Sequence, residues 1–356
     1  MLLSCINMLL FIMAGFMLMY LVYRPQINKF EQSLELTIPM LPIIYMLGLY
    51  GIGSIAAWFV AGHSDFIEPL TLARVVVPLG CAVAIYFAFW LFDEWLFDLT
   101  VIAAVGLTVW LQPLGVGNAY PDLPHYVVQG MAFVFGAAFC LGMRVLNILP
   151  HTVSMPLICV CAGLCVLLLV GSTPAYIAFC GALLLGIYWA YLTLNYYDVK
   201  IDLDDGACVV MSYLVCNLLL MNLGEFCFTS CMIFTMFLWV EIVVAIWQRL
   251  MVTHSGLLRE NTNCYNATDI FTLQGLTVNI LRVCVVLLFM GWFQLFAVNQ
   301  YSLLIVSFAL ALWLGNFNGK SGRATLKEIN KEFMSELKQN IEETKNLFTG
   351  RKKDGE

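Results

Sequence analysis

Two short clusters of carboxylates hold the side chains in this sequence that are best suited to chemistry. Their members are Asp93, Glu94 and Asp98 in the first cluster and Asp198, Asp202, Asp204 and Asp205 in the second. Carboxylate oxygens bind hard divalent cations and can also accept protons as general bases. The two clusters can form one cation site if the fold brings them to the same side. Solvated loop ends that bind no ligand are the alternative interpretation.

The rest of the chain is strongly apolar, which sets the environment in which these carboxylates must be held. Of the 356 residues, 62% are hydrophobic and 11% are charged, whereas a soluble domain carries about 25% charged residues. Nine of the 17 Lys and Arg residues and seven of the 23 Asp and Glu residues lie after Gly319. We therefore predict an all-α transmembrane bundle over residues 1–318 and a charged tail over residues 319–356.

A helix needs about 20 apolar residues to cross the roughly 30 Å hydrocarbon core of a bilayer. We expect eleven spans, at residues 2–22, 39–61, 72–92, 99–115, 126–147, 153–171, 174–196, 207–224, 227–248, 278–297 and 300–316. The first stretch has no basic segment before it and no small-residue cleavage site after it. We interpret it as a retained span and not as a removed signal.

Basic residues predict the orientation, because cytoplasmic loops are enriched in Lys and Arg. Before the tail, only Arg74 falls on the side opposite to the tail. The basic residues on or beside loops that share the side of the tail are Arg24, Lys29, Arg144, Lys200, Arg249, Arg259 and Arg282. We therefore predict a cytoplasmic C-terminus, and both carboxylate clusters then lie on the cytoplasmic side.

Other features narrow the class of protein. Most of the 13 cysteines lie in apolar runs without a CxxC pair, which is typical of packing residues. The chain has no dense basic stripe, so nothing indicates a nucleic-acid partner.

Residues 251–277 form a long polar loop of the kind that often carries function. Residues 324–348 repeat apolar side chains at helical spacing, which predicts an amphipathic helix on a membrane or a partner; a partly frayed, solvated tail is the alternative.

Several motifs occur in a fixed order along the predicted cytoplasmic loops. They are Val22-Tyr23-Arg24-Pro25-Gln26 followed by Lys29, then Phe92 to Asp98, then Leu203-Asp204-Asp205-Gly206-Ala207, and then Glu241 with Gln248 and Arg249. This order resembles that of the polyprenyl-phosphate N-acetylhexosamine-1-phosphate transferases, in particular the undecaprenyl-phosphate N-acetylglucosaminyl-1-phosphate transferases. The corresponding family motifs are V-D-K-P-N, L-D-D-x-x-D, G-D-A-G-S and an acid followed by two arginines. The similarity covers most of residues 15–316 and is one of layout more than of motif.

The sequence departs from this family at two motifs that carry the chemistry. Where the family has N-x-x-D-G-x-D-G, this chain has Asn147-Ile148-Leu149-Pro150-His151-Thr152-Val153-Ser154, without either aspartate. Where the family has a His-x-His-His cluster, the nearest match is Asn263-Cys264-Tyr265-Asn266, without a histidine. Because the loss of one electrostatic donor commonly slows an enzyme about a hundredfold, the loss of several argues against ordinary catalysis.

The resemblance implies a glycosyltransferase-4-like domain in a bacterial inner membrane, with undecaprenyl phosphate and a UDP-sugar as substrates. It also implies a Mg²⁺ cofactor if the chain is active, and a homodimer or a pair with an active paralogue. Transferred residue by residue, it implies Asp93 and Glu94 as catalytic groups and Asp204 and Asp205 as metal ligands. The implied substrate-binding residues are Lys29, Asn147, Arg259, Asn263 and Asn266.

Three functions of different classes are compatible with these patterns. The first is an inactive member of this fold that binds a lipid-linked substrate or a partner enzyme. The second is an active but divergent magnesium-dependent transferase that uses Asp93, Glu94 and Asp204. The third is an unrelated transporter or channel, which the scarcity of charged residues inside the predicted spans weighs against. An intramembrane aspartyl protease is disfavoured because its glycine-x-glycine-Asp signature is absent.

Overall fold

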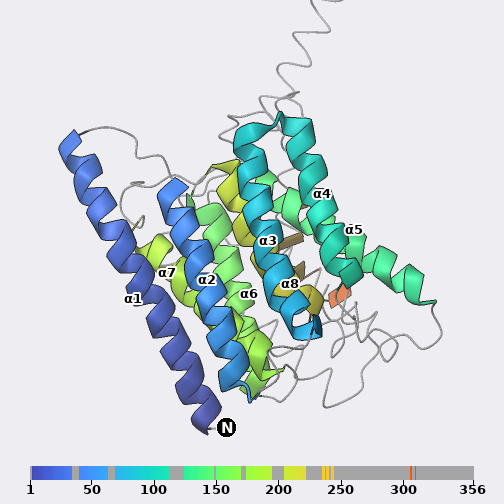
Figure 1. Cartoon of the computed structure of the whole chain (residues 1–356), viewed down its shortest axis with the longest axis horizontal. Coiled ribbons are helices and arrows are strands. Elements are labelled where there is room, and N and C mark those ends of the chain that lie inside the picture. The colour runs from blue at the N-terminus through green and yellow to red at the C-terminus, as the bar shows by residue number, and fades with distance from the viewer. Residues whose placement is uncertain are drawn as a thin grey trace, which may run out of the picture.

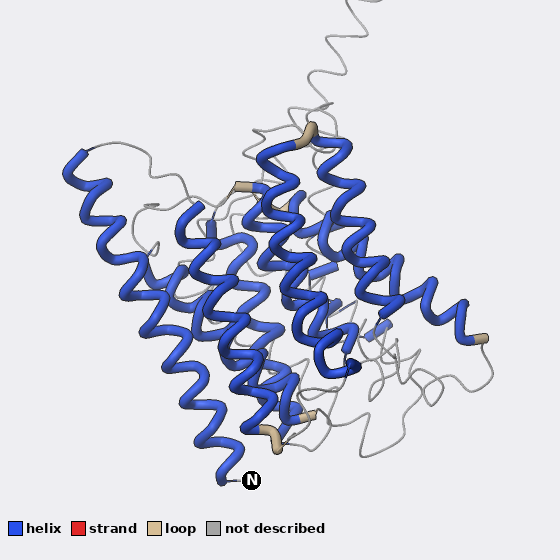
Figure 2. The backbone as a smooth tube through the Cα atoms, viewed as in Figure 1, coloured by secondary structure: helices blue, strands red, loops and turns tan. Residues whose placement is uncertain are grey.

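The computed structural model describes seven continuous ranges, residues 2–33, 40–62, 69–111, 124–147, 150–169, 174–194 and 204–221, together with a few helical residues between 235 and 309. Within these ranges the chain forms helices and no strand (Figures 1 and 2). The helices are α1 (Leu2–Ser33), α2 (Met40–Val60), α3 (Pro69–Leu91), α4 (Glu94–Leu111), α5 (His125–Val145), α6 (Pro150–Leu169), α7 (Ala175–Leu194) and α8 (Asp205–Met221). The predicted all-α fold is thereby confirmed for the described part of the chain.

Successive helices run in opposite directions, as Figure 1 shows for α3 and α4, which are joined at the top of the view by Phe92 and Asp93. One side-chain contact between α2 and α7 agrees with this alternation. Trp58 near the end of α2 lies against Tyr176 at the start of α7, with ring centroids 5.0 Å apart. Ion pairs join the C-terminal end of α5 to the N-terminal ends of α4 and α8. These ends meet at one end of the bundle, which we call the charged end.

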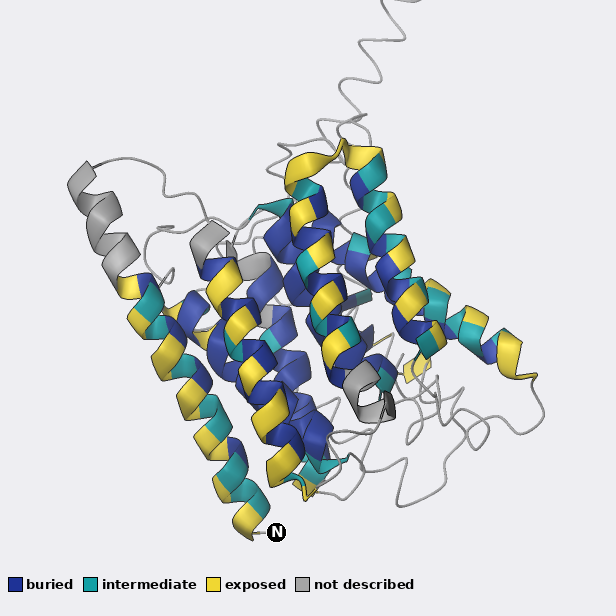
Figure 3. Ribbon diagram, in the orientation of Figure 1, coloured by how far each residue is buried: buried dark blue, intermediate teal, exposed yellow. Residues whose placement is uncertain are grey.

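Two helices form the centre of the bundle. Helix α7 packs mainly against α1, α6 and α2, whereas α8 packs mainly against α5 and α3 and also contacts α4, α6 and α7. Every residue of α8 from Gly206 to Leu220 is buried, and Figure 3 shows the outer face of α1 as mostly exposed. A helix that is buried all round has no apolar stripe of its own, which fits the nearly uniform hydrophobicity of both central segments.

Small residues allow α1 and α7 to approach closely. A Cβ atom placed on Gly186 of α7 would lie 2.2 Å from the carbonyl oxygen of Ile12 in α1. A Cβ atom on Gly15 of α1 would lie 2.6 Å from the carbonyl oxygen of Leu183. Close backbone contact at glycines is typical of helix pairs in membranes, where van der Waals packing drives association.

Several hydroxyl groups inside the bundle form hydrogen bonds to carbonyls of their own helix or to neighbouring helices. The hydroxyl of Ser212 donates to the Cys208 carbonyl at 2.8 Å, and that of Tyr188 donates from α7 to the Met211 carbonyl in α8 at 2.8 Å. The hydroxyls of Thr108 in α4 and Tyr213 in α8 share a hydrogen bond. Eight of the nine cysteines in the described ranges are buried. The hydrogen bonds of these hydroxyl groups inside the bundle are what a chain in hydrocarbon requires.

Five described segments are long and apolar enough to cross a membrane by length and composition. They are Leu2–Arg24, Pro42–Val60, Glu94–Leu111, His125–Val145 and Ala175–Thr193. Shorter apolar helices cover Val75–Leu91, Pro156–Leu169 and Asp205–Met221. The apolar helices indicate a membrane protein. The first eight predicted spans thus correspond to described helices. Of the spans predicted at 227–248 and 300–316 only a few helical residues are described, and the 278–297 span, the 251–277 loop and the tail lie outside the described residues.

Several predicted loop residues belong to helices instead. Helix α1 continues to Ser33, so Lys29 lies in a helix and not in the first loop. Helix α4 begins at Glu94, five residues before the predicted span, because a carboxylate is favourable in a first helical turn. Helix α6 begins at Pro150 and includes His151, and proline is well suited to a first helical position.

Candidate functional site

A buried arginine joins three helices at the charged end. The Nη1 group of Arg144, in the last turn of α5, donates to Oδ1 of Asp98 in α4 at 2.8 Å. Its Nε group donates to Oδ2 of Asp205, the first residue of α8, at 2.8 Å. We call these three residues the Arg144 clamp. It ties α5 to α4 and to α8 through one guanidinium.

The positions of these residues follow from local helix chemistry. Asp204 precedes α8 as its N-cap, and its Oδ1 accepts a hydrogen bond from the Ala207 amide at 2.6 Å. Asp205 then lies at the positive end of the α8 dipole, and Arg144 lies at the negative end of the α5 dipole. Both charges are therefore stabilised by their own helices before they pair with each other.

Further contacts hold the clamp in one geometry. Asn147, just after α5, donates from Nδ2 to Oδ1 of Asp205 at 3.0 Å. The ring of Phe97 lies under the guanidinium of Arg144, 5.3 Å from the Arg144 Cζ atom to the ring centroid. Glu94, one turn before Asp98, interacts electrostatically with the same arginine. The clamp thus has hydrogen-bonding, cation–π and charge contacts on several sides.

The burial of the clamp is graded. The Arg144 side chain is 4% exposed, whereas those of Asp98 and Asp205 are 22% and 33% exposed. A buried guanidinium without partners would be strongly unfavourable inside an apolar bundle, and intramembrane charges accordingly pair with one another. The carboxylates therefore make the burial of Arg144 possible, and they remain partly accessible from the charged end.

The structure brings most of the described candidate residues to this end. Asp93 and Glu94 are exposed at the α3–α4 turn. Asp204 and Asp205 begin α8, and Asn147 binds Asp205. Lys29 belongs to α1, although its side chain is not described. The candidates Arg259, Asn263 and Asn266 lie outside the described residues.

The two aspartates at the start of α8 already bind groups of the protein. Oδ2 of Asp205 binds Arg144 and its Oδ1 binds Asn147, so both oxygens predicted for a metal are engaged. Oδ1 of Asp204 caps α8. Among the described residues no group of three or more His, Cys, Asp or Glu side chains is arranged to hold a metal ion.

Arg144 is the central residue that the sequence pattern did not single out as a site. The sequence pattern predicts Arg144 only as a basic residue beside a loop and Asp98 only as a member of an acidic cluster. One signal was present, because an arginine at the end of an apolar run of 20 residues either reaches the membrane interface or pairs with a counter-charge. Which of the carboxylates supplies that charge depends on the packing of α4, α5 and α8.

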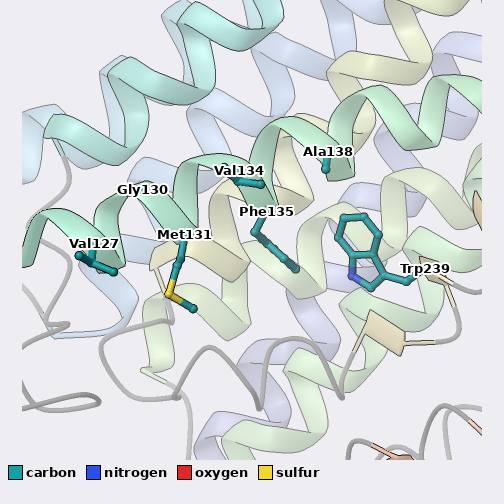
Figure 4. A pocket seen from close by; sticks show the side chains of 7 residues that line it. All are labelled: Val127, Gly130, Met131, Val134, Phe135, Ala138 and Trp239. Atoms are coloured by element: carbon teal, nitrogen blue, oxygen red, sulfur yellow. The ribbon is translucent and has the colours of Figure 1, made fainter. Parts of the chain in front are cut away.

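An open apolar pocket of about 600 Å³ lies along the other side of α5. Figure 4 shows its lining, which consists of Val127, Gly130, Met131, Val134, Phe135 and Ala138 of α5, with Trp239 at one end. Trp239 is held against α5 by Phe135 and Phe139, at ring-centroid distances of 5.5 and 6.2 Å. We call this pocket the α5 groove. Its lining suits an elongated apolar ligand.

The groove and the clamp share one helix. Ala138, at the end of the groove, lies six residues before Arg144, which corresponds to about 9 Å along the helix axis.

No protein-family profile matches the chain, and no curated protein sequence matches it at a significant level. The family resemblance of the loop motifs therefore stays a prediction.

Proposed function

We propose that this chain is a non-catalytic membrane protein that binds a polyprenyl lipid, within a framework similar to that of the polyprenyl-phosphate sugar-1-phosphate transferases. The observation that carries the proposal is the α5 groove, an apolar pocket on the same helix that ends in the Arg144 clamp. The groove takes the apolar chain of the lipid. The assignment of a phosphate head group rests on the resemblance of the loop motifs.

The use of the carboxylates supports a binding role over a catalytic one. Asp98 and Asp205 neutralise Arg144. Their charges therefore hold helices together and do not bind a metal ion. The aspartates expected after α5 and the histidines expected near residue 263 are replaced by other residues. Transfer of a phosphosugar between two polyanions needs compensating positive charge and a group that handles a proton. Both requirements are poorly met by these residues.

An active, divergent transferase is the second candidate. Asp93 and Glu94 are exposed to solvent at the charged end, where Asp204 also lies. In this alternative, Asp93 and Glu94 act on the lipid phosphate while Asp204 contributes to a Mg²⁺ site. A bacterial inner membrane, a cytoplasmic charged end and a homodimer or a pair with an active paralogue belong to both proposals.

Release of UMP separates the two candidates. Purified full-length protein is incubated with UDP-N-acetylglucosamine, undecaprenyl phosphate and Mg²⁺, and UMP is quantified by chromatography. We expect no release above that of protein-free vesicles, because the replaced motif residues would have supplied the charge and proton chemistry. UMP release by the unaltered chain that Asp204→Asn abolishes would overturn the non-catalytic proposal and support the transferase.

Lipid binding is tested by filling the α5 groove. Gly130→Leu places a side chain into the groove at a position where a Cβ atom meets nothing within 4 Å. We expect it to weaken the binding of undecaprenyl phosphate at least about tenfold, or roughly 1.4 kcal/mol, in a titration followed by tryptophan fluorescence. Gly80→Leu in α3 is the matched control, since its Cβ position is equally open but outside the groove. Equal affinities of the two variants would contradict the assignment of the groove.

A further inference from the structure

The outer face of α4 carries an apolar stripe with a tryptophan at each end. Trp95, Leu99, Leu107 and Trp110 are 65%, 54%, 43% and 73% exposed, and Ala103 between them is also exposed. The spacing of three and four residues places all five on one side of the helix. The opposite side, with Val101, Val105 and Thr108, is buried. The stripe is therefore a continuous surface that no described residue covers, and it is partly visible in Figure 3.

The chemistry of the stripe matches the depth profile of a lipid bilayer. Tryptophan is enriched where hydrocarbon meets the polar head groups, because its ring is apolar and its N–H group needs a polar partner. Asp93 and Glu94 lie directly beyond Trp95 and are exposed, which places water or head groups there. Between the two tryptophans the stripe contains only Leu and Ala. A contact with solvent would leave this surface unfavourably hydrated.

Neighbouring aromatic residues repeat the pattern at each end. Trp90 and Phe92, which are 44% and 51% exposed, accompany Trp95 at the charged end. Tyr126 in the first turn of α5, which is 74% exposed, belongs to the same end of the bundle as Trp110. These exposed aromatic side chains form one group at each end of α4, which is the arrangement expected at two membrane–water interfaces.

We propose that α4 faces lipid directly, with Trp95 and Trp110 anchored in the head-group layers of opposite leaflets. The two residues are 15 positions apart, which corresponds to about 22 Å along the helix axis. A typical hydrocarbon core measures about 30 Å. The bilayer beside α4 is therefore thinner than average, and the protein selects or locally produces a thin membrane. This inference rests on membrane residence and is independent of the proposed function.

Quenching of tryptophan fluorescence by brominated lipids tests the position of both anchors. The full chain is reconstituted into phosphatidylcholine vesicles whose acyl chains carry bromine either near the head group or near the bilayer centre. The contributions of Trp95 and Trp110 are obtained by subtracting the spectra of Trp95→Phe and Trp110→Phe from that of the unaltered chain. We expect roughly twofold stronger quenching of each contribution by the shallow bromines. Trp58→Phe is the control, because Trp58 is only 5% exposed.

Each outcome of this experiment bears on the proposal. Stronger quenching by the deep bromines would place the tryptophans inside the hydrocarbon and overturn it. If neither brominated lipid quenches the fluorescence of Trp95 and Trp110, then protein covers the stripe, for example a second copy of the chain. This result would also overturn the proposal. Lengthening the acyl chains should draw both rings into hydrocarbon and shift their emission to shorter wavelength. An emission that does not respond to chain length would contradict the inferred thickness.

Discussion

At the scale of single residues, Arg144 determines how the charged end is built. Its guanidinium is almost completely buried, and it reaches two carboxylates on different helices. Arginine suits this position because its planar fork can bind two carboxylates while its face lies on the ring of Phe97. A lysine would keep the charge but not this geometry, since its ammonium group is compact and strongly hydrated.

Arg144→Met is expected to lower the free energy of unfolding by about 3–5 kcal/mol, because it leaves two carboxylates without their cation. Thermal unfolding in detergent, followed by gel filtration with fluorescence detection, measures the change. Arg24→Met is the matched control. Arg24 is exposed and contacts only the Tyr20 ring among the interactions described for it, at 5.9 Å, so its loss should cost about 1 kcal/mol or less.

A triple variant distinguishes charge pairing from lost packing. Replacing Asp98 and Asp205 by Asn together with Arg144→Met removes all three charges of the clamp. Because neutral replacement of a whole buried ion pair is often tolerated, the triple variant should be more stable than Arg144→Met alone. A triple variant that is less stable than the single one would show that the clamp does not act through charge.

The residue types of the site were visible in the sequence, but their pairing was not. Asp93, Glu94, Asp204 and Asp205 stand out because the first 318 residues contain so few charges. Their predicted roles as catalytic groups and metal ligands are still predictions. The contact between Arg144 and Asp98 joins residues 46 positions apart. No local pattern encodes such a contact, because it depends on how α4 and α5 pack.

At the scale of helices, the contact between α1 and α7 is the tightest described by backbone proximity. Gly186→Leu should destabilise the protein by more than the 1–3 kcal/mol that is typical of overpacking, because its Cβ atom meets a carbonyl oxygen of α1 at 2.2 Å and backbone cannot rotate away. The fall in melting temperature measures this. Gly80→Leu, which makes the same change in open space on α3, should leave the melting temperature unchanged or raise it.

A loss of stability that is equal in the two leucine variants would contradict this prediction, since it would point to a general effect of the substitution and not to the α1–α7 contact.

Helix existence could be predicted from hydropathy, whereas helix ends could not. Each of the first eight apolar stretches contains a helix, because a backbone in hydrocarbon must satisfy its own hydrogen bonds. The ends at Ser33 and Glu94 differ from the predicted span ends because polar residues continue both helices. Polar residues can extend a helix beyond its apolar segment. A prediction based on the length of the apolar segment does not include them.

At the scale of the whole molecule, the alternation of helix directions predicts which turns share a compartment. Reporter fusions of alkaline phosphatase or green fluorescent protein after Gly62, Asp93, Pro124 and Asp204 measure this in bacterial cells. Asp93 and Asp204 should give fluorescence because both lie at the charged end, which we propose to be cytoplasmic, whereas Gly62 and Pro124 should give phosphatase activity. The same reporter responding at Asp93 and Gly62 would contradict a membrane crossing by α3.

The choice of central helices could not be read from composition. Helix α8 is buried all round and α7 is buried except at Trp189 and its two ends, although α2 is at least as hydrophobic as either of them. In a membrane the lipid is as apolar as the protein interior, so hydrophobicity does not sort helices between centre and periphery. Polar contacts such as the one between Tyr188 and Met211 help to do so, and they depend on tertiary packing.

The burial of most described cysteines makes the chain suitable for labelling a single introduced thiol. Maleimides and oxidants react with a thiol only where they can reach it, and a thiol buried among apolar helices is shielded from them. In the described ranges Cys5 is the one cysteine that is not fully buried. Once the cysteines outside these ranges have been replaced, a single new thiol at a chosen turn should take up a label almost alone, and the packed interior need not be rebuilt with serines.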